Sequence, residues 1–124
     1  MSKRKTMAIN LAWIFWIGMA GAGFSSEGMP IIKDRDVFLD VMDDSELRYL
    51  VVRVKVKADG TIKGRALRWD ITGNWTWENG FFCREMDWGG YAIDYNCQEV
   101  RAQGNRMRFT SDQGSGDTAL FRIR

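Results

Sequence analysis

Apolar and basic residues alternate in the stretch "YLVVRVKVKADGTIKGRALRWDI", which begins at Tyr49. Val52, Val54 and Val56 alternate with Arg53, Lys55 and Lys57. A period of two is that of a strand with one buried face. An Asp-Gly pair at 59–60 follows, and such a pair tolerates the positive φ of a two-residue hairpin turn. The pattern therefore predicts an antiparallel hairpin.

The returning strand of this hairpin changes the parity of its apolar positions. Ile62 and Ala66 stand at even positions, whereas the apolar residues from Leu67 onwards stand at odd positions. One extra residue in a strand has this effect on the side chains that follow it. We therefore expect a β-bulge within residues 64–67.

Turn signals recur along the rest of the chain. They are Gly73-Asn74, Asn79-Gly80, Gly89-Gly90, "AQGN" and "DQGSGD". The segments between them have the length and alternation of short strands, about seven in all. Such spacing is typical of antiparallel sheets and not of alternating strands and helices. The sequence predicts a mainly β fold, a small antiparallel β-barrel or sandwich of about seven strands.

One short helix is expected before the strands. Its apolar face is formed by Val37, Phe38, Val41 and Met42, which have helical spacing. Asp34 is a suitable N-cap, so we predict a helix over 34–46 within a single β-domain at 34–124. The preceding segment, 23–33, contains the only proline, Pro30. We expect it to be a linker that packs little against the domain.

The N-terminus has the three-part pattern of a secretory signal peptide. Basic residues come first, an uncharged apolar run follows at 7–20, and small residues end it. Ala20-Gly21-Ala22 suits a signal peptidase, so we assign the signal peptide to 1–22. The apolar run is shorter than the roughly 20 residues of a spanning helix. We expect a periplasmic or secreted protein with no stable membrane anchor once the leader is removed.

Removal of the leader changes the charge of the chain. The whole sequence has 18 basic and 16 acidic residues, and three of the basic ones lie in the leader. The remaining 15 basic and 16 acidic residues give a net charge of −1. They are interspersed along the chain, without the concentrated positive field that a nucleic-acid backbone requires. We therefore expect no nucleic-acid partner.

Cys83 and Cys97 are the only cysteines. In a small exported domain a cysteine pair is read first as a disulfide, and the alternatives are a pair of reactive thiols or a metal site. The chain has no histidine, so a zinc site would lack ligands. Ser-His-Asp and Cys-His nucleophiles are absent for the same reason. We expect a disulfide, and no catalytic residue, metal or cofactor.

Eight aromatic residues fall between positions 69 and 95. Such residues either fill the core of a small barrel or line a recognition surface. Trp88, Tyr91 and Tyr95 flank a glycine turn, where side chains reach solvent. We take these three as the candidate binding surface for a protein or small-molecule ligand of unknown identity.

Three carboxylates lie between the cysteines, at Glu85, Asp87 and Asp94. Two carboxyl groups that meet across strands can act as a general acid and base. The alternative is that these side chains are solvated or form ion pairs with Arg84 and Arg101.

Residues 73–124 contain three motifs that together resemble a known group. They are "GNWTWENGFFCR", "NCQ" and "RFTSDQGSGD". The group comprises small exported alphaproteobacterial proteins, and the resemblance implies a β-domain without a defined activity. Many members are named dihydrodipicolinate reductase. A reductase of that kind needs a Rossmann unit with a glycine-rich turn before a helix, which this chain lacks. Gly73-Asn74-Trp75 is also similar to the G-x-W of lipocalin-like barrels, which favours a barrel.

Three classes of function remain open from the sequence. The expected one is a non-enzymatic binding or accessory protein. The second is an enzyme, either the reductase of the group's name or a hydrolase built on the three carboxylates. The third is a structural accessory subunit of an envelope complex, for which an exposed apolar sheet edge would be the sign. A completely filled barrel would exclude a small-molecule carrier.

Overall fold

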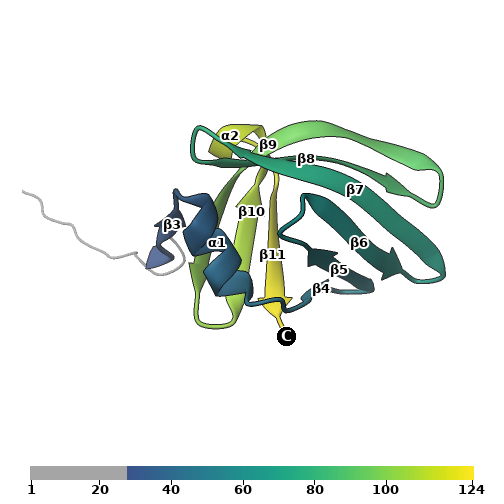
Figure 1. Cartoon of the computed structure of the whole chain (residues 1–124), viewed down its shortest axis with the longest axis horizontal. Helices are drawn as coiled ribbons and strands as arrows, with labels where there is room; N and C mark the ends of the chain where they lie inside the picture. The colour runs from purple at the N-terminus through teal and green to yellow at the C-terminus, as the bar shows by residue number, and fades with distance from the viewer. Residues whose placement is uncertain (1–27) are drawn as a thin grey trace, which may run out of the picture.

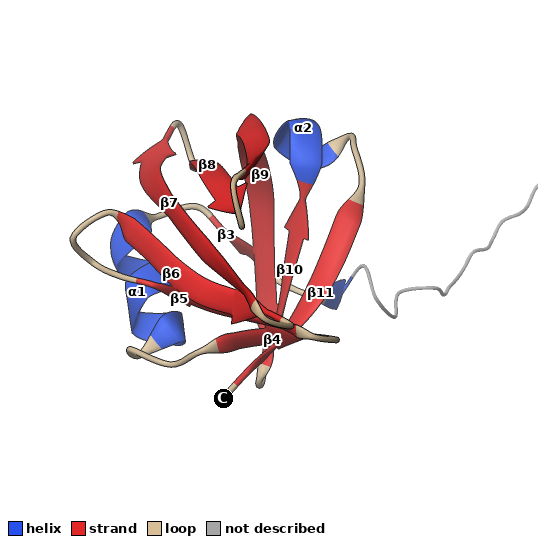
Figure 2. Ribbon diagram, turned by 90° about the vertical axis from the view of Figure 1, so that its right-hand side faces the viewer, coloured by secondary structure: helices blue, strands red, loops and turns tan. Residues whose placement is uncertain are grey.

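The computed structural model describes residues 28–124, which form an antiparallel β-barrel with two short helices (Figure 1). The elements in chain order are β3 (Ile31–Ile32), α1 (Arg35–Met42), β4 (Leu47–Tyr49), β5 (Val52–Val56), β6 (Thr61–Ala66), β7 (Trp69–Glu78), β8 (Phe81–Trp88), β9 (Tyr91–Gln103), β10 (Arg106–Thr110), α2 (Ser111–Gly114) and β11 (Thr118–Ile123). Figure 2 shows α1 beside the strands and α2 at the connection from β10 to β11.

The sheet closes on itself through β9. Eight strands follow one another in the order β10-β11-β4-β5-β6-β7-β8-β9, and β9 pairs with β10 to complete the ring. The strand β3 lies outside the ring and pairs with β9 at Val100 and Arg101, beyond the section that β8 covers. The predicted mainly β, antiparallel fold is confirmed. Of the barrel and the sandwich that the sequence left open it is the barrel, with eight strands in the ring where the sequence indicated about seven.

Two tight turns escaped the sequence analysis. Leu50 begins a two-residue turn between β4 and β5, and Leu67 begins another between β6 and β7, with φ of 52° and 57°. The expected bulge at 64–67 is therefore wrong, because Ala66 pairs directly with Trp69 across the second turn. A two-residue turn shifts the parity of apolar positions just as a bulge does. The bulge of this barrel instead lies between β8 and β9.

Gly73 was expected to break the chain but lies in the middle of β7. A Cβ atom at this position would stand 2.4 Å from the carbonyl oxygen of Glu85 on β8. Gly64 on β6 is equally constrained, since its Cβ would stand 2.1 Å from the carbonyl oxygen of Arg53 on β5. Glycine within a strand permits a close approach of neighbouring backbones and a sharp bend. These two glycines let the sheet curve enough to close.

The helix α1 is shorter than the predicted 34–46. It ends at Met42 because Asp43 and Asp44 take left-handed φ values of 45° and 58°. Asp34 occupies the N-cap position, and its carbonyl oxygen accepts the first helical hydrogen bond from Phe38 N–H at 3.0 Å. Its side chain makes no capping bond.

Phe38 joins the helix to the barrel core. Its side chain is fully buried and contacts four inward-facing aromatic rings. The ring centroids lie 5.5 Å away for Trp75, 5.2 Å for Trp77, 5.4 Å for Phe82 and 6.5 Å for Phe109. The four rings come from β7, β8 and β10. This one side chain therefore packs α1 against three strands of the barrel.

The segment expected to be a linker packs against the domain in its described part. Met29 and Ile32 are buried, and the carbonyl oxygen of Pro30 accepts a hydrogen bond from Ala102 N–H at 3.1 Å. The prediction that 23–33 packs little is therefore wrong from Met29 onwards. The predicted signal peptide, 1–22, lies outside the described residues. Within 28–124, no helix has the length and apolarity to cross a membrane.

The disulfide between Cys83 and Cys97 is present, as predicted. The two residues are directly opposite in the β8–β9 ladder, with Cα atoms 3.9 Å apart. Arg84 and Asn96 form the next pair of the same ladder. The covalent bond therefore holds the register of these two strands immediately beside Arg84.

Replacing Phe38 with alanine should lower the free energy of unfolding by about 3–5 kcal/mol, because a buried ring is lost and a cavity remains. Urea unfolding followed by tryptophan fluorescence measures the change. Val37→Ala is the matched control, since Val37 is on the same helix but 46% exposed. It should stay within about 0.5 kcal/mol of the parent protein. Equal losses for the two variants would contradict this role of Phe38.

Removing the disulfide by the double change Cys83→Ser and Cys97→Ser should cost about 3 kcal/mol, since a closed loop of this length restricts the unfolded chain. The same unfolding experiment measures the loss, and the oxidised and reduced parent protein should differ by a similar amount. An unchanged unfolding midpoint after reduction would show that the bond adds no stability.

Candidate functional site

The interior of the barrel is not completely filled. A cavity of about 180 Å³ lies among inward-facing side chains from seven of the eight ring strands, all except β7. Most of its wall is apolar and includes Leu47, Val54, Ile62, Met86 and Phe121. A cavity of about 150 Å³ with such a lining holds a benzene molecule in a model protein. The space is therefore sufficient for a small apolar ligand.

The helix α1 does not reach this cavity. Phe82 and Phe109 line the cavity and also contact Phe38. These two rings therefore separate the helix from the empty space. Phe82 and Phe109 thus lie between the aromatic cluster around Phe38 and the cavity.

Arg84 is the one charged residue in the cavity lining. It stands between Phe82 and Met86 on β8, and alternation along the strand gives all three the same inward direction. One guanidinium N–H donates to the carbonyl oxygen of Asp94 at 2.7 Å. In the described chain the guanidinium of Arg84 makes no other hydrogen bond and forms no salt bridge.

Burial lowers the pKa of Arg84 from its ordinary value. Arginine still keeps its proton at physiological pH. A partly desolvated cation without a carboxylate partner is unfavourable, and an anion brought to it would relieve that cost. The environment of Arg84 is therefore suited to a carboxylate or a similar small anion.

Gln98 is the second polar residue of the lining. It lies opposite Phe82 in the β8–β9 ladder, and its side-chain amide donates to the hydroxyl of Ser111 at 3.3 Å. The bulge between Arg84 and Met86 accommodates the Asp94 carbonyl that orients the guanidinium. Arg84 and Gln98 thus supply polar groups to an otherwise apolar wall, the usual composition of a ligand pocket.

Arg84 was not among the predicted site residues. It was considered only as an ion-pair partner of neighbouring carboxylates, which it is not. Arg101, named in the same way, does form an ion pair, with Glu99 at 2.9 Å. The available signal was parity, because "FFCREMDW" places Arg84 in phase with the apolar Phe82 and Met86.

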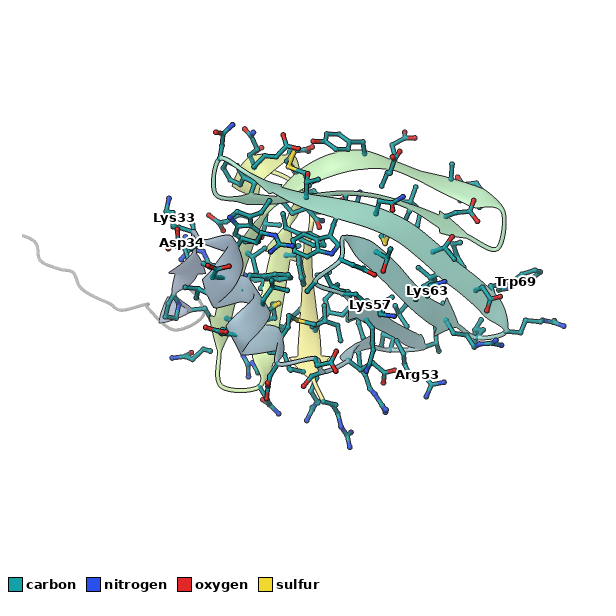
Figure 3. The ribbon with its side chains drawn as sticks, viewed as in Figure 1. Lys33, Asp34, Arg53, Lys57, Lys63 and Trp69 are labelled. Atoms are coloured by element: carbon teal, nitrogen blue, oxygen red, sulfur yellow. A yellow bond between two sulfur atoms is a disulfide. The ribbon has the colours of Figure 1, made fainter. Side chains whose placement is uncertain are left out.

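The three predicted surface aromatics do not form one surface. Trp88 and Tyr91 face each other across the β8–β9 hairpin and line a shallow hollow together with Trp69. Figure 3 shows Trp69 at the edge of the molecule, far from Lys33 and Asp34 beside α1. Tyr95 points instead toward the disulfide, with its hydroxyl 3.3 Å from the Cys97 sulfur.

Exposure at these three positions agrees with a surface location. Trp88 is 39% exposed, Tyr91 74% and Tyr95 56%. Trp75 and Phe82, from the same aromatic set, are instead buried in the core. The hairpin tip has exposed rings but only a shallow hollow, so it offers a ligand less enclosure than the barrel cavity does.

Two of the three predicted carboxylates come together, since Glu85 and Asp87 line one surface hollow of about 450 Å³ with Lys63. Asp87 accepts a hydrogen bond from the backbone N–H of Gly90 at 2.7 Å and so stabilises the hairpin turn. Glu85 lines a small surface hollow beside Tyr95. Among residues 28–124, no group of three or more His, Cys, Asp or Glu side chains is placed to hold a metal ion.

Comparison with known proteins adds no family to this picture. No protein-family model, curated protein or solved structure matches the chain. The resemblance of residues 73–124 to small exported alphaproteobacterial proteins stays a prediction, as does the name dihydrodipicolinate reductase attached to that group. The barrel cavity and Arg84 are therefore the features from which a function can be inferred.

Proposed function

We propose that this protein is a non-enzymatic binding protein whose ligand is a small apolar anion held in the barrel cavity. The observation that supports this most strongly is Arg84, a partly buried cation without a carboxylate partner on the wall of an apolar space. An acid with a short aliphatic or aromatic body would place its carboxylate at Arg84 and its body against the apolar wall.

The size of the cavity limits the ligand. Since about 150 Å³ accommodates a six-carbon ring, a space of about 180 Å³ suits a body of similar size. The cavity is partly open to solvent, so its volume limits the part of the ligand that enters it. The proposed ligand class is therefore monocarboxylic acids with a short aliphatic or aromatic body.

The alternatives receive less support from the side chains. An enzyme built on Glu85, Asp87 and Asp94 would need two carboxylates that are free to exchange protons. The side chain of Asp87 already accepts a hydrogen bond from Gly90 N–H in the hairpin turn. The reductase of the group's name would need a nucleotide-binding unit, and the closed barrel has no parallel strand–helix–strand unit within 28–124. A structural accessory role remains as the other non-enzymatic proposal.

The disulfide supports the proposed location. Such bonds persist in oxidising compartments, and Cys83 and Cys97 are joined. We therefore keep the periplasm or the exterior of the cell as the proposed site of action.

Calorimetric titration with straight-chain and aromatic carboxylates should show saturable binding to the parent protein, strongest for acids whose body fits the cavity. Arg84→Met should weaken that binding by about 10- to 100-fold, the value of a charge-assisted hydrogen bond of about 1.5–3 kcal/mol. Arg65→Met is the matched control, because Arg65 is exposed and paired with Asp70 at 3.1 Å. It should bind as the parent does.

Arg84 also orients the bulge through Asp94, so a second variant keeps the test independent of folding. Arg84→Lys retains the cation and should retain part of the affinity, while the primary amides of the same acids should bind weakly to every variant. Equal affinity of the parent and Arg84→Met for the acids would contradict the proposal, as would equal affinity of the parent for acids and amides.

Filling the cavity gives a further check. Ala119→Phe places a ring in the lining and should abolish binding of the acids, because no space remains for their apolar body. Thermal unfolding would show whether the variant is folded. A folded Ala119→Phe protein that binds the acids with parental affinity would place the ligand outside the cavity.

A further inference from the structure

Five arginines form a continuous row across the outside of the barrel. They are Arg106 on β10, Arg122 on β11, Arg48 on β4, Arg53 on β5 and Arg65 on β6. Each is the direct cross-strand partner of the next, through four consecutive antiparallel ladders. Adjacent strands lie about 4.8 Å apart, so the row concentrates positive charge that is dispersed in the sequence.

Carboxylates neutralise only part of this row. Arg48 pairs with Glu46 at 2.8 Å and Arg65 with Asp70 at 3.1 Å. The described chain provides no salt bridge to Arg53, Arg106 or Arg122, all three of them exposed. Like charges directly opposite one another destabilise a sheet. A row that costs stability in the free protein is consistent with an external anionic partner.

Three members of the row share one surface hollow. Arg48, Arg106 and Arg122 line a depression of about 290 Å³ together with Tyr49, Leu50 and Leu120. Arg53 continues the row on the outer side of β5, at the lower edge of the molecule in Figure 3. The hollow therefore combines several cationic groups with an apolar surface.

Leu50 is the most unusual member of this surface. It is 86% exposed and stands at the tip of the β4–β5 turn with a φ of 52°. Positive φ is uncommon for a bulky residue, and glycine or asparagine would suit the turn better. Val51 beside it is also exposed, at 52%. An apolar tip in this position gains nothing in water.

We propose that this surface docks reversibly on an anionic lipid membrane. The phosphate groups of the lipids bind Arg106 and Arg122, and they also bind the terminal N–H groups of Arg48, because Glu46 engages only its Nε. Leu50 enters the boundary with the acyl chains. Basic side chains are attracted to anionic lipids, and apolar side chains at the same place add burial. A soluble polyanion would use the arginines but would leave Leu50 in water, so the lipid surface accounts for more of the hollow.

This inference goes beyond the proposed function and does not depend on the barrel cavity. Basic and acidic residues are interspersed along the sequence, so we expected no concentrated positive charge. The strand register nevertheless places five arginines side by side on this face. Docking of this kind needs no membrane-spanning segment. The prediction that no nucleic acid binds stays a prediction, and binding of an oligonucleotide is a competing outcome of the vesicle experiment.

Vesicle co-sedimentation tests the proposal with the protein recovered after export, its processed N-terminus established by intact mass. Vesicles of phosphatidylcholine alone are compared with vesicles containing about 30% phosphatidylglycerol. Binding to the anionic vesicles should be at least tenfold stronger and should weaken steeply from about 0.05 M to about 0.5 M salt. The triple variant Arg48→Gln, Arg106→Gln and Arg122→Gln should lose at least tenfold in affinity.

The matched control removes the same charge elsewhere, by Lys33→Gln, Lys57→Gln and Lys63→Gln, and should lose less than threefold. Thermal unfolding checks that both triple variants fold. Leu50→Asn suits the turn and should weaken vesicle binding severalfold while leaving binding to heparin and to a single-stranded oligonucleotide unchanged. Equal losses in the two triple variants would overturn the arginine site. Vesicle binding unaffected by Leu50→Asn, with oligonucleotide or heparin bound as tightly as vesicles, would overturn the lipid assignment in favour of a soluble polyanion.

Discussion

The structure depends on the pairing of one long strand, β9, with two other strands of the ring. The first part of β9 pairs with β8 and the second part with β10, and this double pairing turns an eight-strand sheet into a closed ring. Closure gives the barrel an interior, and it removes the free edges that an open sheet would expose. The inward direction of Arg84 follows from the same ladder, whose register the disulfide holds at the adjacent pair of residues.

Closure also leaves the interior unevenly filled. Phe38 and four aromatic rings pack one region tightly, while the cavity remains beyond Phe82 and Phe109. A domain of this size has little stability to spare, so an unfilled apolar space with a partly desolvated arginine is a cost to folding. Such departures from the best-packed arrangement are expected where a protein binds something.

The sequence predicted the elements whose causes are local. Alternating valines, the turn at Asn79-Gly80 and the cysteine pair each have a direct physical signal, and the structure contains the corresponding strands, turn and bond. The turns at Leu50 and Leu67 have no such signal, because a leucine at positive φ is held there by the pairing of the strands around it. Local propensity yields to tertiary pairing at these positions.

The candidate site was less predictable than the fold. Trp88, Tyr91 and Tyr95 were chosen for their nearness to a turn, but the β8–β9 bulge sends Tyr95 to the opposite face from the other two. The arginine row depends on register across four ladders, which residue spacing does not reveal. Only the parity of Arg84 was visible in the sequence.

The proposed function requires Arg84 to bind an anion at the barrel cavity. Side-chain NMR of the arginine guanidinium groups, recorded while a short aromatic carboxylate is added, tests it most directly. We expect a saturable shift of the Arg84 Nε–H resonance with little change at Arg101, whose guanidinium is already paired with Glu99. An unmoved Arg84 resonance at saturating acid, or equal small shifts at all arginines, would contradict it.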